Sequence, residues 1–167
     1  MRPLLIGGAA GVLIVVLAAC GGSSSNSASE QAMQRDADRW AIEQISKQWH
    51  KATSSQNVGL MMSLWAPHAI WTIEPGRTLV GRKQLRRYFL TESAPFRPEN
   101  HWISHSAAYK IRITVNGDKG TLYFECHYVD AKTAKVVRST GADQDVARIN
   151  GRWLITNMVG AAPKLSP

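Results

Sequence analysis

Three residues that could carry chemistry stand side by side in "GTLYFECHYVD", residues 120–130: Glu125, Cys126 and His127. A cysteine beside a base is the arrangement that nucleophilic catalysis uses. The segment is rich in aromatic and β-branched residues and predicts a β-strand, whose successive side chains point to opposite faces. Cys126 therefore faces away from both of its neighbours. The pattern indicates an ordinary strand rather than a nucleophile with its base.

The two faces of this strand are expected to differ in character. The apolar face continues onto the preceding strand across the Asn116-Gly117 turn, and we expect it to face the core. Glu125 and His127 belong to the opposite face, which is expected to be a polar surface suited to solvent or a partner subunit. The predicted core face comprises Leu122, Phe124, Cys126, Tyr128, Tyr109, Ile111, Ile113 and Val115, and the predicted outer face Glu125, His127, Lys110, Arg112 and Tyr123.

Two histidines are candidates for the concave face. If no bulge intervenes, the alternation runs backwards from Tyr109 and places His101 and His105 on the same side as the core residues. His101 is then a candidate for proton transfer and His105 a pocket residue. The alternative for His101 is that it caps its strand and hydrogen-bonds the loop before it.

Asp143 is the second candidate for proton transfer. A four-residue loop within "DAKTAK" would pair Tyr128 with Val137 and turn Ser139, Asp143 and Asp145 inward, whereas a loop of the other parity would turn them outward. In an apolar cavity, desolvation would raise the pKa of such a carboxyl toward neutrality, as a general base requires. The alternative is that Asp143 and Asp145 mark a solvated edge.

The chain has six tryptophans. Five of them, Trp40, Trp49, Trp65, Trp71 and Trp102, fall on segments expected to close the open end of the curved sheet. Tryptophan pairs a large apolar face with one donor, which suits a flat or cyclic ligand, although the rings could equally fill the cavity themselves. The predicted ligand pocket comprises Trp49, Trp65, Trp71, His105, Phe124 and Tyr128.

Other site classes find no support in the sequence. It has no Gly-rich phosphate loop, no C-x-x-C pair, no H-E-x-x-H and no G-x-S-x-G. His127 has the wrong parity to join His101 and His105 in a metal site, and no carboxylate is placed to complete one. We therefore expect no metal and no cofactor.

The N-terminus predicts export and lipid anchoring. "MRPLLIGGAAGVLIVVLAAC" has one basic residue followed by an apolar run, which is typical of a secretory signal, and its end "LAAC" resembles the bacterial lipobox. The resemblance implies diacylation of Cys20 and a domain held at the extracytoplasmic face of the cell membrane. A retained membrane helix and an unlipidated secreted protein are the alternatives. Lipidation of Cys20 leaves Cys126 without a partner, so no disulfide is expected.

The predicted organisation is a signal peptide over residues 1–19, the lipidated Cys20 with a flexible Gly/Ser-rich linker over 20–29, one domain over 30–162 and a short tail over 163–167. Without Arg2, 19 Lys and Arg stand against 12 Asp and Glu, a net charge of +7. On an exported protein this charge favours anionic lipids or envelope polymers over nucleic acid.

The elements of the domain follow from hydrophobic spacing. A capping box at Ser27 and Glu30 is expected to begin a long helix that runs to about Ser54, and Asn57 is expected to precede a short helix. The buried stripe of the long helix is predicted to include Met33, Ala37, Trp40, Ala41, Ile45, Trp49 and Ala52. A hairpin over 69–81, a helix in "RKQLRRYFL" and strands flanking two Asn-Gly turns complete an α+β domain.

The order of these elements resembles a known family. "LWAPHAIW", "GRKQLRRYF", "VNGDKGTL" and "INGRWLI", in that order, are similar to the SnoaL-like, ketosteroid-isomerase-like branch of the nuclear transport factor 2-like superfamily. The resemblance implies a cone-shaped fold in which a curved antiparallel sheet wraps a long N-terminal helix with two shorter helices. It also places His101 at a position where the family often has a histidine.

The resemblance does not carry the family's catalytic acid with it. Catalytic branches often have a stretch like "Y-x-x-A-x-D-x-x-D" near the end of the first helix, where this chain has "WHKATSSQN", with Ser54 and Asn57 in place of the carboxylates. His50, beside Trp49, is expected at the surface. The ketosteroid-isomerase mechanism therefore does not transfer intact.

We expect a lipid-anchored domain that binds a small hydrophobic or aromatic ligand or serves as an accessory module of the cell envelope. One alternative is an isomerase or dehydratase that uses His101 or Asp143 for proton transfer. Another is a structural envelope subunit that forms a homodimer through the outer face of the sheet, with Glu125, His127 and Arg112 at the interface.

Overall fold

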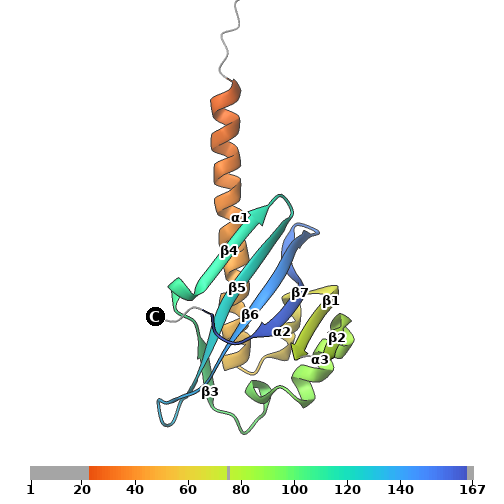
Figure 1. Cartoon of the computed structure of the whole chain (residues 1–167), viewed down its shortest axis with the longest axis vertical. Coiled ribbons are helices and arrows are strands. Elements are labelled where there is room, and N and C mark those ends of the chain that lie inside the picture. The colour runs from red at the N-terminus through yellow and green to blue at the C-terminus, as the bar shows by residue number, and fades with distance from the viewer. Residues whose placement is uncertain (1–22, 75, 165–167) are drawn as a thin grey trace, which may run out of the picture.

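The computed structural model describes residues 23–74 and 76–164 (Figure 1). The signal peptide and Cys20 lie outside the described residues. Within them the chain forms three α-helices, two short 3₁₀ helices and seven strands. These are α1 (Ser23–Ser54), α2 (Val58–Ser63), β1 (Trp65–Glu74), β2 (Arg77–Val80), α3 (Gly81–Thr91), η1 (Ala94–Phe96), β3 (Trp102–His105), η2 (Ala108–Lys110), β4 (Ile111–Asn116), β5 (Lys119–Asp130), β6 (Val136–Ile149) and β7 (Arg152–Ala161).

The strands form one curved sheet in the order β2-β1-β7-β6-β5-β3, with β4 also paired to β5. β4 with β5 and β6 with β7 are antiparallel hairpins, as the two Asn-Gly turns predict, and β5 and β6 are antiparallel as well. The β1–β7 pair is parallel, so the sheet is mixed rather than wholly antiparallel. The sheet wraps the second half of α1, which confirms the α+β cone expected from the sequence (Figure 1).

Helix α1 has two different halves. Its second half buries Ile42, Ile45, Trp49 and Ala52, which recur at helical spacing and face the sheet. Its first half stands clear of the sheet (Figure 1). The predicted buried stripe is therefore wrong at its N-terminal end, where the side chains of Met33 and Trp40 are 64% and 63% exposed.

The start of α1 also differs from the prediction. The helix begins at Ser23, so residues 23–29, predicted as part of a flexible linker, are helical. Ser27 lies inside the helix rather than at its N-cap. Helical periodicity indicates which face of a helix is apolar, but it cannot indicate where along the helix the rest of the domain begins to cover that face.

A buried polar clamp fixes α1 where it meets the sheet. Arg148 on β6 donates to Asp38 Oδ2 at 2.6 Å, and the indole of Trp153 on β7 donates to Asp38 Oδ1 at 3.3 Å. Asp38 is buried, so these bonds compensate for the loss of its hydration. These hydrogen bonds to Asp38 lie at the point where α1 extends beyond the sheet.

The shorter elements form largely as predicted. Asn57 caps α2 by accepting a hydrogen bond from Leu60 N at 2.8 Å. Helix α3 buries Leu85 and Phe89 and turns its arginines and lysine outward. On β5, Leu122, Phe124, Cys126 and Tyr128 all belong to the hydrophobic core, whereas Tyr123 and Glu125 between them do not, which confirms the predicted alternation.

Candidate functional site

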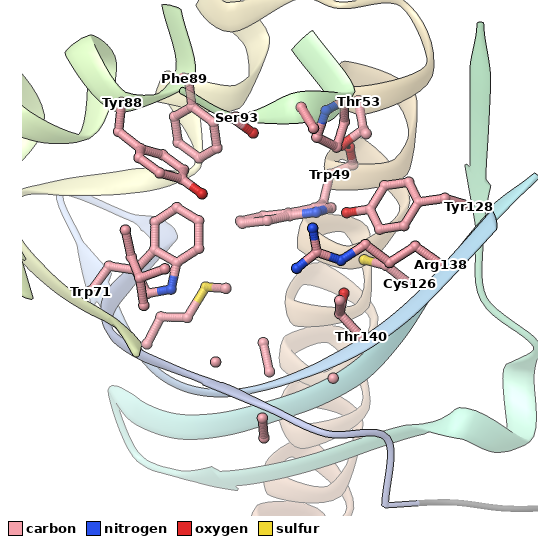
Figure 2. A pocket seen from close by; sticks show the side chains of 18 of the residues that line it. Trp49, Thr53, Trp71, Tyr88, Phe89, Ser93, Cys126, Tyr128, Arg138 and Thr140 are labelled. Carbon is pink, nitrogen blue, oxygen red and sulfur yellow. Dashed lines mark hydrogen bonds between the residues drawn. The ribbon is translucent and has the colours of Figure 1, made fainter. Parts of the chain in front are cut away.

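A cavity of about 330 Å³ opens between the second half of α1, helix α3 with the loop after it, and the inner face of the sheet (Figure 2). Its wall is mainly aromatic and aliphatic. Two of the predicted tryptophan positions and two predicted β5 positions are among its lining residues. Those that the site depends on are Trp49, Trp71, Tyr88, Phe89, Phe124, Cys126, Tyr128, Arg138, Thr140 and Ala142.

The aromatic rings of the wall hold one another in place. The centroid of the Trp49 ring lies 5.8 Å from Phe124 and 6.3 Å from Trp71, both edge-to-face. Trp71 stacks on Phe89 at 5.5 Å. Such ring pairs contribute beyond simple burial and restrict one another's rotamers. The cavity is therefore a pre-formed apolar hollow rather than a gap between mobile side chains.

Trp65, also predicted in the pocket, lies behind this wall. It is fully buried and stacks on Trp71 at 5.7 Å, but it does not line the cavity. Trp65 thus supports Trp71, whose ring does line the cavity. Trp49, Trp71, Phe124 and Tyr128 line the cavity, the last two as the alternation along β5 requires. That they bind a ligand stays a prediction.

Three polar side chains point into the cavity from different elements. The hydroxyls of Tyr88 on α3 and Tyr128 on β5 approach the same space as the guanidinium of Arg138 on β6 (Figure 2). Burial raises the pKa of both tyrosines, while the charge of Arg138 acts in the opposite direction. Both phenols thus stay protonated at physiological pH and can donate hydrogen bonds.

The prediction that Asp143 faces inward is wrong. Tyr128 pairs with Arg138, not with Val137, so Arg138, Thr140 and Ala142 face the cavity and Asp143 faces outward. The β5–β6 register shifts next to Tyr128, where Val129 pairs with Val136 and leaves Val137 as an extra, bulged residue. Val129 pairs with Val136 and Asp130 N donates to Lys135 O, so the four-residue loop forms as predicted, and the bulge alone shifts the parity by one.

The predicted positions of His101 and His105 on the concave face are also wrong. The 3₁₀ helix η2 interrupts the strand at Ala108–Lys110, so the alternation does not pass through it, and Tyr109 is 63% exposed. His105 pairs with His127 across β3 and β5 and therefore shares its outer face, while its neighbour Ser104 faces the core. His101 and His105 are both exposed.

Cys126 lies in the floor of the cavity, whereas His127, its neighbour in sequence, lies on the opposite face of β5. Burial raises the pKa of its thiol from 9.0 to about 12. A thiol in that state is a weak nucleophile at neutral pH. The Glu-Cys-His trio is therefore split between the two faces of β5, as the alternation predicts.

The outer face of β5 is not the solvated surface expected from the sequence. Glu125 is 0% exposed. Its carboxylate accepts hydrogen bonds from Lys110 Nζ at 2.9 Å, from the Tyr123 hydroxyl at 2.9 Å and from the backbone N–H of Lys164 at 3.0 Å. His127 Nε2 lies 3.4 Å from the same carboxylate. The chain covers Glu125 by itself, so this side chain is not free to contact a partner, and a homodimer through the outer face of the sheet stays a prediction.

His50 is not at the surface either. Its Nδ1 lies 2.8 Å from Ser104 Oγ, and its ring packs edge-on against Phe124 with centroids 5.4 Å apart. Burial, with smaller effects from His105 and His127, lowers its pKa from 6.5 to about 4. The imidazole is therefore neutral at pH 7 and part of the packing behind the cavity.

Sequence reasoning missed Arg138, the one cation that lines the described part of the cavity. Asp130, whose Oδ1 accepts from the backbone N–H groups of Lys132 and Thr133, indicates the tight loop. No residue pattern signals the bulge at Val137 that turns Arg138 inward. Among the described residues no group of three His, Cys, Asp or Glu side chains is arranged to hold a metal ion. None of the described helices is both long and apolar enough to cross a bilayer.

Comparison with solved structures gives the fold of this chain. An NTF2-like protein with a cystatin-like fold from Novosphingobium aromaticivorans superposes with a TM-score of 0.70 at 15% identity over 87% of this chain and 93% of that one. The hexachlorocyclohexane dehydrochlorinase LinA-type3 from Novosphingobium barchaimii gives 0.64 at 18% identity over 81% and 93%. An NTF2-like dehydratase candidate from Streptomyces avermitilis gives 0.60 at 16% identity over 78% and 99%.

Comparison with curated protein sequences gave no match. The model of the SnoaL-like domain matches residues 34–159, which span the described domain from the middle of α1 to near the end of β7. With the cone-shaped sheet, the long helix and the aromatic cavity in place, the chain belongs to the SnoaL-like family of the nuclear transport factor 2-like superfamily.

Proposed function

We propose that this chain is a lipid-anchored, extracytoplasmic SnoaL-like domain that binds a small, apolar, ring-containing molecule in the cavity between α1 and the sheet. The observation that carries the proposal is the cavity itself. Its volume of about 330 Å³ lies within the range of small-molecule sites, and Trp49, Trp71 and Phe124 give it a rigid aromatic wall.

The lining chemistry favours binding over turnover. The polar groups that point inward are hydroxyls and a guanidinium, and the Tyr128 phenol and the Cys126 thiol are held protonated by burial. Groups in these states donate hydrogen bonds and orient a ligand, whereas proton abstraction needs a group that is deprotonated at working pH. Glu74, the carboxylate among the described lining residues, is exposed at the end of β1.

Binding can be tested with naphthamide, a neutral bicyclic aromatic probe. Naphthamide is expected to change the tryptophan emission of the wild-type protein in a saturable manner, because two indoles line the cavity. Ala142→Phe fills the cavity from β6 and should abolish the change. Val159→Phe, on the exposed side of β7, is the matched control and should retain it. Absence of a saturable signal in the wild type would refute the proposed function.

Support for the anchor is the "LAAC" sequence that ends at Cys20 and the signal-like run before it. If Cys20 is acylated, the wild-type chain expressed with its own N-terminus will be found in the membrane fraction, and its mass will include the lipid. Cys20→Ser is expected to move the protein to the soluble fraction, while the control Cys126→Ser stays with the membrane. Equal partitioning of both variants would contradict lipid anchoring.

A further inference from the structure

Arg138 occupies an unusual position for a cation. It lies on β6 opposite Tyr128, on the face of the sheet that carries mainly apolar side chains. Its guanidinium extends into the cavity toward Trp49 and Tyr128 (Figure 2). The residue is exposed at the cavity mouth, and within the described part of the chain its guanidinium forms no ion pair. A guanidinium beside an apolar wall and without an ionic partner is available to an anion that enters the cavity.

The other polar groups of the cavity wall can donate hydrogen bonds. The hydroxyls of Tyr88 and Tyr128 point into the same space, and Thr140 lies beside Arg138 on the inner face of β6 (Figure 2). The indole Nε1 of Trp71 is buried without a hydrogen-bond partner among the described residues. Buried donors normally find acceptors, so this set favours a ligand that brings oxygen acceptors with it.

We propose that the ligand of this cavity is an aromatic or alicyclic monocarboxylic acid whose carboxylate is bound by Arg138 with the Tyr128 and Tyr88 hydroxyls. This inference rests on the proposed function and names the ligand class. A guanidinium presents two parallel N–H groups that match the two oxygens of a carboxylate, while the ring of the acid packs against Trp49 and Trp71.

A residue at the rim of the cavity restricts the class of carboxylic acids that would bind. Glu74 lines the cavity at the end of β1, where β1 meets the β2 hairpin. Its carboxylate would repel a second acidic group on the ligand, which favours a monocarboxylate over a dicarboxylate. Arg138 would thus attract the single carboxylate of the ligand, and Glu74 would disfavour a ligand that carries a second one.

The test compares naphthoate with naphthamide, which share the ring and differ in charge. Dissociation constants are measured by tryptophan fluorescence and by calorimetry on the full chain. The wild type is expected to bind naphthoate about 10- to 100-fold more tightly than naphthamide, the range expected for a hydrogen-bonded charge pair. Arg138→Gln should remove this preference, so that naphthoate and naphthamide bind with similar dissociation constants. Arg138→Lys should keep only part of it, because an ammonium cannot form the bidentate contact.

Arg112→Gln is the matched control, since Arg112 is exposed on β4 at the outer face of the sheet and lies away from this cavity. It should retain the wild-type preference. Thermal unfolding of each variant checks that the fold is kept. Equal binding of naphthoate and naphthamide by the wild type, or an unchanged preference in Arg138→Gln, would overturn the carboxylate inference while leaving the proposed function standing. If neither probe binds, both fail.

Discussion

Both faces of β5 carry buried side chains, but the two faces differ in what surrounds those side chains. On the inner face, Phe124, Cys126 and Tyr128 line a hollow and leave room beside them. On the outer face, Glu125 is as deeply buried, but Lys110 and the C-terminal segment at Lys164 cover it with hydrogen bonds. The apolar face of this strand therefore borders an empty cavity, whereas its ionic face is covered by side chains and backbone of the same chain.

This difference between the two faces suits the inner face to ligand binding and the outer face to stabilising the fold. An apolar wall tolerates an empty space, because no polar group there loses its hydration without compensation. A buried carboxylate does not, because its charge must be paired and hydrogen-bonded within the fold. The inner face is thus free to accept a ligand, whereas the outer face is fixed by the chain's own residues.

The largest expected effect concerns the reactivity of Cys126. With its pKa raised to about 12, roughly one thiol in ten thousand is ionised at pH 8. In a Cys20→Ser background, labelling of native protein by a thiol reagent should be about a thousandfold slower than labelling in denaturant, as followed by absorbance. His127→Ala should not change the rate, since His127 faces the other way. Rapid native labelling that His127→Ala slows would reopen the Glu-Cys-His trio as a catalytic group.

The outer face is tested by Glu125→Ala. Loss of the carboxylate leaves the Lys110 ammonium buried without its partner, which should lower the free energy of unfolding by about 3–5 kcal/mol. Urea denaturation measures the change. The double variant Lys110→Met with Glu125→Leu should recover much of the loss, because it removes both charges together. A loss below about 1 kcal/mol would mean that this pair is solvated like a surface pair.

The two faces of β5 also differ in how well the sequence predicts them. Alternation within one strand is a local property, and it predicted correctly that Cys126 turns away from Glu125 and His127. The cover over Glu125 comes from Lys110 and Lys164, which are separated from it by 15 and 39 residues. No local pattern encodes such a contact, so a polar strand face could not be told from a buried one.

The missed site residues have a similar cause. His105 was misplaced because η2 breaks the strand that the alternation was carried through, and Asp143 because the bulge at Val137 adds one residue to β6. A shift of one residue reverses every side chain along a strand. The same shift that excludes Asp143 from the cavity brings in Arg138, so one bulged residue that no sequence pattern signals decides the chemistry of the cavity.

A smaller effect is expected from His50, which packs behind the inner face. Burial lowers its pKa from 6.5 to about 4, so the unfolded chain binds a proton more readily than the folded one between these pH values. Stability contributed by the neutral imidazole is present above about pH 6.5 and is lost as the pH falls toward 4. The free energy of unfolding should drop by about 2 kcal/mol from pH 7 to pH 5.

His50→Gln should flatten this part of the pH profile while keeping a polar group near Ser104. His68→Gln is the control, because His68 is exposed on β1 and its imidazole is solvated in the folded chain. Urea denaturation at pH 5, 6 and 7 measures each profile. An unchanged slope in His50→Gln would contradict the assignment of this pH dependence to the inner imidazole.

The smallest effect is expected at Asp143, where the two faces of the sheet are compared most directly. Its carboxylate pairs with the ammonium of Lys164, and the two side chains are 49% and 52% exposed, so water already solvates both charges. Asp143→Asn should change the free energy of unfolding by less than about 1 kcal/mol, as urea denaturation measures it. It should also leave naphthamide binding unaltered, because Ala142 and not Asp143 faces the cavity. Loss of binding in Asp143→Asn would require β6 to pair with β5 in the other register, which would turn Arg138 outward and remove the basis for carboxylate recognition.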